Sequence, residues 1–241
     1  GCTEESLFYF SASESLTRAI NSHLWSEEHQ AYVDCIHANG ARSSIFSMQT
    51  QVMALVTGIA AGERREKLIS YLTLPPENFV AIGSPFMTFF YYEALVMSGE
   101  TDYMLQDMRK QFGEMVKHEA TTCWEMYPGF TENRANPKDL TRSHCHAWSA
   151  APGYFLGASV LGVRPIADGW TQIRVAPQPG DLQWAKGAVP LPGDGRVDVA
   201  WQIREEEGEL VFQMEVCAPK EVTIVMEAPE GFRPVLIHQT L

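Results

Sequence analysis

The spacing of apolar residues changes near Gly162, and this change constrains the fold more than any other feature of the chain. Before it, apolar residues recur at the spacing of an amphipathic helix, as in the segment 45–59. After it, apolar and polar residues alternate in short runs, most clearly over 197–203. Such alternation is typical of antiparallel strands with one face in water. We therefore predict a helical domain over residues 1–163 and a small antiparallel β-sandwich over residues 164–241.

The helical part is expected to contain about six helices. Ser11 and Glu14 are spaced as a capping box, and Ser84 followed by Pro85 is a strong signal for a helix start. The residues after Pro85 are apolar nearly all round, which favours a buried core helix over a sugar-stacking surface. The expected helices cover residues 11–29, 44–62, 63–72, 85–97, 101–115 and 143–161.

Composition narrows the classes of partner. The chain has 241 residues, 45% of them hydrophobic, which is enough for a sizeable core. Its net charge is −12 and its basic residues do not cluster, which argues against nucleic acid and an anionic membrane and favours a neutral ligand. No run approaches the roughly 20 apolar residues of a transmembrane helix, and no leader peptide is evident. The cysteines are widely spaced without a CxxC pair, so neither a disulfide framework nor a structural zinc site is expected.

Two dense clusters of polar and aromatic residues flank a polar loop. The first reads TTCWE over residues 121–125, and the second reads SHCHAWS over residues 143–149. The loop between them contains prolines and a glycine and cannot be a continuous helix. A carboxylate and imidazoles beside indoles suit a sugar site, because the rings stack on C–H faces while the polar groups bind hydroxyls or move protons. The alternative, given equal weight, is that both tryptophans are core residues and Glu125 is a surface acid.

Simpler interpretations compete at other positions. His144 and His146 are two residues apart, so on a helix their side chains would diverge by about 200° and could not share one metal ion. We therefore expect no metal site, and nothing in the sequence indicates a cofactor. The alternative for His146 is a hydrogen-bonded core histidine. In the β part, Trp184 and Trp201 are expected in the core of the sandwich.

Three further segments stand out beside the two clusters. They read VDCIHANG, IGSPFMTFFYYEAL and VRPIADGW followed by VAPQPGDL. Together with the clusters they resemble the C-terminal part of the bacterial α-L-rhamnosidases, inverting glycoside hydrolases with an (α/α)6 barrel. The resemblance covers essentially the whole chain. It implies a bacterial protein, of the cytoplasm or the periplasm, in which about half of an (α/α)6 toroid precedes a small antiparallel β-sandwich.

The resemblance also implies roles for individual residues. The glutamate of the family's TTxWE motif is the catalytic general base and falls on Glu125. The histidine of its S-x-x-H motif lines the sugar subsite and falls on His146, while Trp124 and Trp148 fall where the family has aromatic residues at or near the pocket for the cleaved sugar. His144, in the same cluster, is a further candidate for substrate binding. This chain reads Ser-His-Cys-His where many members read Ser-Leu-Asn-His, so the contacts of that asparagine cannot be carried over.

An inverting mechanism needs a second carboxyl group, a general acid roughly 6.5–9.5 Å from the base. The family carries this acid in the first half of the barrel, for which this chain has no room. Glu132 and Asp139 are the acids within reach by sequence, and a solvated role in the polar loop is favoured for both. Glu125 must be ionised to act as a base, which predicts hydrogen-bond donors around it, such as Thr121, Thr122 or His146.

Three functions are compatible with these observations. The first is inverting hydrolysis of terminal α-L-rhamnosyl residues in a rhamnose-containing glycoside, with this chain as a C-terminal fragment that lacks the general acid. The second is a catalytically inactive carbohydrate-binding or structural fragment. The third is another carbohydrate-active enzyme with a similar toroid, such as a polysaccharide lyase. An open half-barrel would expose apolar helix faces, so self-association through the helices is expected as well.

Overall fold

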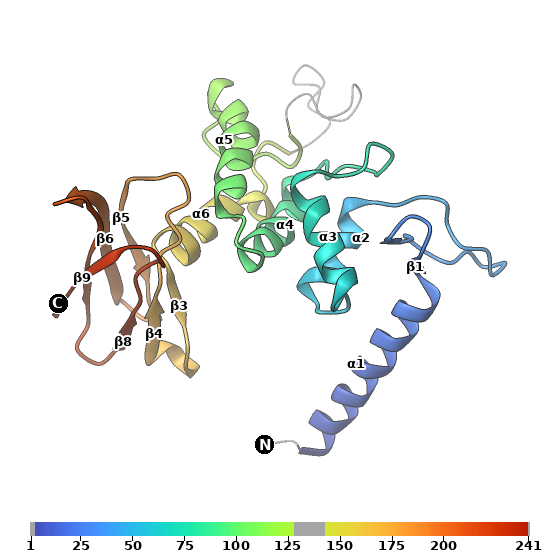
Figure 1. Cartoon of the computed structure of the whole chain (residues 1–241), viewed down its shortest axis with the longest axis horizontal. Helices are drawn as coiled ribbons and strands as arrows, with labels where there is room; N and C mark the ends of the chain where they lie inside the picture. Colours follow the sequence, from blue (N-terminus) through green and yellow to red (C-terminus); the bar gives the residue numbers. More distant parts are fainter. Residues whose placement is uncertain (1–2, 128–142, 241) are drawn as a thin grey trace. The chain divides into compact units, whose positions relative to one another are not determined.

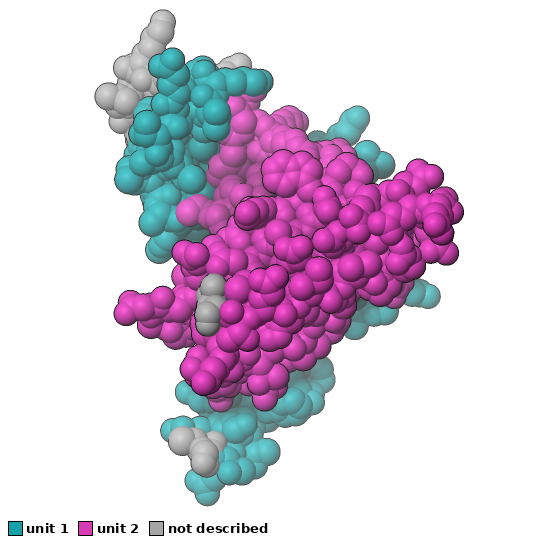
Figure 2. Space-filling model, turned by 90° about the vertical axis from the view of Figure 1, so that its left-hand side faces the viewer, with its two compact units in different colours: residues 1–100, 115–149 teal, residues 101–114, 150–241 magenta. Residues whose placement is uncertain are grey.

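The computed structural model describes residues 3–127 and 143–240 and divides into two compact units. The first unit comprises residues 1–100 and 115–149, and the second comprises residues 101–114 and 150–241 (Figure 2). The predicted order of six helices followed by a β-sheet part is confirmed (Figure 1). The two units do not follow a single cut in the sequence, and the boundary expected after residue 163 stays a prediction.

Local sequence signals explain where two of the helices begin. The hydroxyl of Ser84 accepts the N–H of Phe86, and Pro85 occupies the first turn, as expected. Ser47 caps its helix in the same way by accepting the N–H of Thr50. The described helices are α1 Thr3–His23, α2 Met48–Val56, α3 Glu63–Thr73, α4 Pro85–Met97, α5 Thr101–Lys117 and α6 Ala151–Phe155, with a 3-10 turn η1 at Ala147–Ser149 and a π-helical turn η2 at Leu156–Val160.

The predicted bounds of the first helix are wrong. α1 begins at Thr3 instead of Ser11, because Glu4 and Glu5 favour a first helical turn and nothing in the segment 3–10 breaks a helix. It ends at His23, because the chain then forms a short hairpin of β1 Trp25–Ser26 and β2 Ala31–Tyr32.

The second and last helices also differ from expectation. The residues just before Ser47 are not helical, because their backbone pairs with an earlier segment. The N–H of Ser43 donates to the carbonyl oxygen of Cys35 at 2.9 Å, and the carbonyl oxygen of Ile45 accepts the N–H of Asp34 at 3.2 Å. Residues 143–146 are not helical either, since their backbone pairs with the segment 123–125. The helical stretch that remains is broken into η1, α6 and η2. At the end of η2 the N–H of Leu161 donates to the carbonyl oxygen of Leu156, five residues back, as in a π-helix.

Helices α2, α3 and α4 pack together and form the core of the first unit. Val52 of α2, Leu68 of α3 and Tyr92 of α4 are fully buried. The aromatic run at the start of α4 was expected in the core, and this is wrong for Phe86, which is 41% exposed because it lies on the first turn. Pro85 and Thr88 of the same turn are buried, so this turn is open only on the side of Phe86.

The β part is built from two sheets. One has the order β3-β4-β8 and the other the order β5-β6-β7-β9. The expected wholly antiparallel pairing is wrong in detail, since β4–β8 and β7–β9 are parallel. The reason is that the chain crosses from β7 to the other sheet for β8 and then returns, so that β9 enters beside β7 in the same direction. The strands are β3 Val163–Pro165, β4 Gln172–Val175, β5 Trp184–Pro190, β6 Arg196–Glu206, β7 Glu209–Ala218, β8 Thr223–Met226 and β9 Arg233–Thr240.

The two tryptophans expected in the β core have different positions. Trp201 is buried, and its indole N–H donates to the carbonyl oxygen of Val160 at 2.8 Å. Trp184 is 66% exposed, so its predicted core position is wrong. It lies on the edge strand β5 opposite Gln202, and because side chains alternate along a strand it points to the face opposite that of Trp201.

Helix α1 carries an uncovered apolar surface. None of its residues is buried, and five large apolar side chains are between 62% and 68% exposed, namely Leu7, Phe8, Tyr9, Phe10 and Leu16. Neither α1 nor any other helix within residues 3–127 and 143–240 is both long and apolar enough to cross a membrane. Exposed apolar side chains in such number are typical of a surface that another protein segment covers.

Candidate active site

The two clusters identified in the sequence lie side by side in the first unit. The N–H of Glu125 donates to the carbonyl oxygen of Ser143, and the N–H of His146 donates to that of Cys123, both at 2.9 Å. The hydroxyl of Thr122 donates to the carbonyl oxygen of His144. These bonds hold the backbones of the two clusters side by side.

The carboxylate of Glu125 is held by the backbone of the second cluster. Its Oε2 accepts the N–H of Ser143 at 3.1 Å, and its side chain is partly exposed. Thr122 was expected to donate a hydrogen bond to this carboxylate, but its hydroxyl donates to the carbonyl oxygen of His144. Glu132 and Asp139, considered as partner acids, lie outside the described residues. The described geometry thus supplies one positioned carboxylate.

Trp124 and His144 form a stacked pair. Their ring centroids are 4.4 Å apart and their planes differ by 14°. His118 lies 6.0 Å from the same indole, and Trp124 is only 9% exposed. This burial fits the core interpretation of Trp124, in which the indole supports the cluster and His144 covers one of its faces. Direct sugar contacts by Trp124 and His144 stay predictions.

Trp148 is in a different environment. The η1 turn presents its indole to solvent with 67% exposure. The ring of His146 lies 6.1 Å away at 70°, and the ring of Phe86 lies 4.9 Å away at 36°. The rings of His146 and Trp148 therefore lie near each other, and both side chains are at least partly exposed.

Two residues that sequence reasoning missed belong to this site. Ser84 donates its hydroxyl to the carbonyl oxygen of Glu125 at 3.1 Å, which ties the start of α4 to the first cluster. Phe86, two residues later, carries the ring that packs against Trp148. The Ser-Pro pair signals a helix start, but no local pattern reveals that this start meets a segment about 40 residues later.

The chemistry available at this site is that of a carboxylate, two imidazoles and an exposed indole. Burial raises the pKa of the Cys123 thiol, which keeps it protonated and disfavours a thiolate nucleophile. Among the residues that the structure describes, no three His, Cys, Asp or Glu side chains gather so as to hold a metal ion. The site therefore suits acid–base chemistry on a neutral, hydroxyl-rich ligand.

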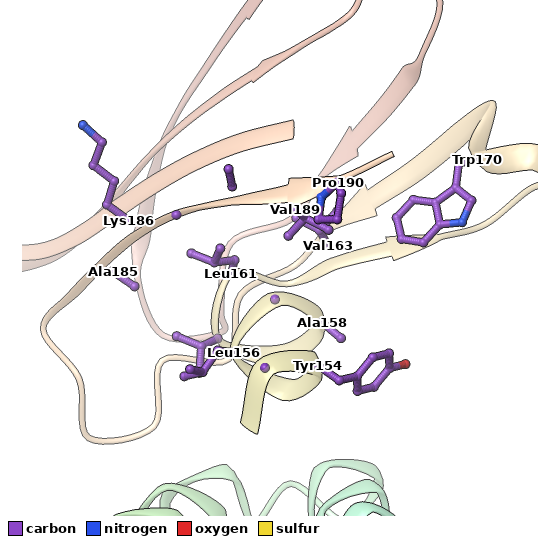
Figure 3. A pocket seen from close by; sticks show the side chains of 15 residues that line it. Tyr154, Leu156, Ala158, Leu161, Val163, Trp170, Ala185, Lys186, Val189 and Pro190 are labelled. Carbon is purple, nitrogen blue, oxygen red and sulfur yellow. The ribbon is translucent and has the colours of Figure 1, made fainter. Parts of the chain in front are cut away.

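The second unit has a separate cavity of about 550 Å³ between η2 and β5 (Figure 3). Leu156, Leu161 and Val189 line it together with Tyr154 and Trp170. Of the described residues that line it, only Lys186 is charged, and its side chain points away from the helix. A cavity with this lining has no carboxylate pair for hydrolysis, so the clusters around Glu125 are the stronger candidate.

Comparison with known proteins gives consistent matches. Residues 1–160 match the model of the bacterial alpha-L-rhamnosidase 6 hairpin glycosidase domain, and residues 162–236 match that of the bacterial alpha-L-rhamnosidase C-terminal domain. A solved GH78 family rhamnosidase of Bacillus sp. GL1 is 51% identical with a TM-score of 0.92, over 100% of this chain and 25% of that one.

More distant relatives agree with these matches. A rhamnosidase from Klebsiella oxytoca with rhamnose bound is 24% identical, with a TM-score of 0.52 over 64% of this chain and 29% of that one, a likeness in fold alone. A curated alpha-L-rhamnosidase of Formosa agariphila is 23% identical over 95% of this chain and 27% of its own length. The chain thus spans about a quarter of the length of the relatives it matches.

Proposed function

This chain belongs to the bacterial α-L-rhamnosidase family, and from that premise we propose that the enzyme containing it hydrolyses terminal α-L-rhamnosyl residues with inversion at the anomeric carbon. The activity is proposed for that enzyme because the chain spans only about a quarter of its relatives. One observation carries the assignment within this chain. The Glu125 carboxylate is oriented by a backbone donor of the cluster that also carries His146 and Trp148.

In the proposed reaction, Glu125 acts as the general base. Its carboxylate takes a proton from a water molecule, and the water oxygen attacks the anomeric carbon on the face opposite the leaving oxygen. The glycosidic C–O bond breaks as the new C–O bond forms, and a general acid gives a proton to the leaving oxygen. That acid is proposed to be a carboxyl group roughly 6.5–9.5 Å from Glu125, contributed from outside the two clusters.

The other residues of the clusters are proposed to bind the substrate. His146, whose backbone N–H binds the carbonyl oxygen of Cys123, is proposed to hold a sugar hydroxyl with its ring. Trp148 presents an open indole next to it. Trp124 and His144 stack on each other and are proposed to form the wall behind the base. A neutral deoxysugar also suits a chain of net charge −12, which would repel an acidic one.

Hydrolysis of p-nitrophenyl α-L-rhamnopyranoside tests this function. We expect the wild-type enzyme to release β-L-rhamnose first, observed by proton NMR before mutarotation, and Glu125→Gln to lose about 10²–10⁴-fold in kcat. Glu77→Gln is the matched control, because Glu77 is an exposed acid of the same unit. Release of α-L-rhamnose would contradict the inverting mechanism, and rhamnose binding without turnover would favour a carbohydrate-binding role.

We also propose that the chain on its own associates with a second copy through α1. The support is the five large apolar side chains of α1 that are more than 60% exposed. Multi-angle light scattering of the chain should show a dimer or a larger species, and Leu7→Ser with Phe8→Ser should shift it to the monomer. A wild-type monomer at high protein concentration would refute this proposal.

A further inference from the structure

The outer face of the sheet β5-β6-β7-β9 carries an indole that the proposed reaction does not use. Trp184 is 66% exposed and lies on the edge strand β5. Trp201 of β6 and Met214 of β7 are buried on the inner face, so Gln202 and Gln213, their neighbours in the chain, share the outer face with Trp184. Tryptophan side chains bury most of their area on average, so one held open on a regular sheet is a candidate platform for a ligand.

Two glutamine side chains stand in a row with this indole. Trp184 pairs with Gln202 across the strands, and Gln202 pairs with Gln213. Opposite side chains on neighbouring strands lie about 5 Å apart, so the nearer amide can reach a ring that is stacked on the indole. The amide of Gln202 donates to Oε1 of Gln213 at 3.4 Å, and the amide of Gln213 donates to Oε1 of Glu215 at 3.3 Å. Each amide has two N–H donors and an acceptor oxygen, so both retain the capacity to bind hydroxyl groups of a ligand.

The same face is hollowed by two adjoining depressions of about 310 and 530 Å³. Trp184 lines the first, and both are lined by Lys186, Ala200 and Glu215. Ala200 stands between Lys186 and Glu215 in the register, and its short side chain leaves the centre of the face low. From the row of Trp184 to the row of Asp198 the face extends about 13 Å along the strands. The hollow is therefore long enough for a chain of sugars and is not limited to a single ring.

The charges of this face balance. Lys186 and Arg196 line the depressions together with Asp198 and Glu215, which are two positive and two negative side chains. Arg196 and Asp198 are paired, with Nε and Oδ2 3.0 Å apart. Such a balance favours a neutral ligand. Of the described side chains that line the two depressions, Trp184 is the one large apolar group that is exposed, whereas a protein interface usually has a larger apolar centre.

We propose that this outer face, from Trp184 to Asp198, is a second carbohydrate site, which binds a stretch of a neutral oligosaccharide or polysaccharide without cleaving it. The indole stacks on the C–H face of one sugar ring, while Gln202 and Gln213 bind hydroxyls of that ring and the next. The site is independent of the proposed function, because its residues belong to the second unit and the Glu125 clusters belong to the first. Its effect is to hold the protein on a polymer.

Native electrophoresis in gels that contain a dissolved polysaccharide tests this site on the complete chain. The net charge of −12 makes the chain migrate towards the anode at neutral pH. We expect at least one of three neutral polymers, xyloglucan, galactomannan and a rhamnan, to slow this migration, and the polyanion polygalacturonate not to. Trp184→Ala should raise the dissociation constant by about tenfold or more, and Gln202→Ala and Gln213→Ala by about three- to tenfold each. Trp184→Phe keeps an aromatic ring and should lose less than Trp184→Ala.

Tyr154→Ala is the matched control, because Tyr154 is an exposed aromatic residue of the same unit that lines the other cavity. It should bind as tightly as the wild type. A loss as large as that of Trp184→Ala would place the sugar in the other cavity and overturn the assignment.

Three other results would also overturn it. They are unchanged migration in every neutral gel, equal slowing by polygalacturonate, and slowing that survives Trp184→Ala. If light scattering instead shows that Trp184→Ala changes the oligomeric state, while no neutral polymer slows the wild type, a second copy of the chain occupies this face and no sugar does.

Discussion

Replacing Gly162 with alanine tests how tightly the chain turns from η2 into the β part. Gly162 has a φ of +78°, and a Cβ at this position would lie 2.2 Å from the carbonyl carbon of Ala176 and 2.3 Å from the nitrogen of Pro177. Both are backbone atoms, so no side-chain rotation can relieve the overlap. The left-handed conformation costs alanine about 1–2 kcal/mol, and displacing the packed backbone costs about 1–3 kcal/mol more. We therefore expect Gly162→Ala to lower the free energy of unfolding by about 2–5 kcal/mol.

Gly169→Ala separates the two contributions. Gly169 also has a positive φ, of +66°, but no atom lies within 4 Å of the Cβ position. This variant should therefore lose only the conformational part, about 1–2 kcal/mol. Urea unfolding followed by tryptophan fluorescence and by circular dichroism measures both variants under the same conditions. If Gly162→Ala proves no less stable than Gly169→Ala, the steric argument is refuted.

Two further predictions concern single contacts in the second unit. Trp201→Phe removes the buried donor to the carbonyl of Val160 and should lower the free energy of unfolding by about 1–3 kcal/mol, whereas a loss as small as that of the exposed control Trp184→Phe would contradict it. The Arg109 guanidinium, bonded to Asp181 at 2.7 and 2.8 Å, holds the pKa of that carboxyl below its ordinary value. A lowered folded-state pKa gives stability that is present above the ordinary pKa and is lost as pH falls through the lowered one. Because the two side chains are 51% and 42% exposed, Asp181→Asn should cost less than about 1 kcal/mol at pH 7 and nothing near pH 2, and a cost that does not vary with pH would refute the pairing.

Local signals explain how much of the fold could be predicted. The Ser84–Pro85 start of α4 and the alternation of β6 and β7 were confirmed, because each depends on a few neighbouring residues. The parallel pairing of β7 with β9 could not be found in this way, since it depends on the route of the chain through the other sheet. Trp184 shows the same limit, because a period-two pattern does not reveal which face of the edge strand β5 is covered.

The candidate site was predicted in composition but not in geometry. The sequence placed a carboxylate, imidazoles and indoles in two clusters, and the structure brings these clusters together. The segment 143–146 was expected to start a helix, because nothing local indicates that its backbone pairs with residues 123–125. The approach of Phe86 to Trp148 escaped prediction for the same reason, since it joins residues that are far apart in the sequence.

The central claim is that Glu125 removes the proton from the attacking water, and azide tests it most directly. Azide is a nucleophile that carries no proton at neutral pH, so it can attack the anomeric carbon without a base. In Glu125→Ala, hydrolysis of p-nitrophenyl α-L-rhamnopyranoside should fall by about 10²–10⁴-fold, and added azide should restore turnover with β-L-rhamnosyl azide as the product. Activity within about tenfold of the wild type, with no response to azide, would show that another group acts as the base.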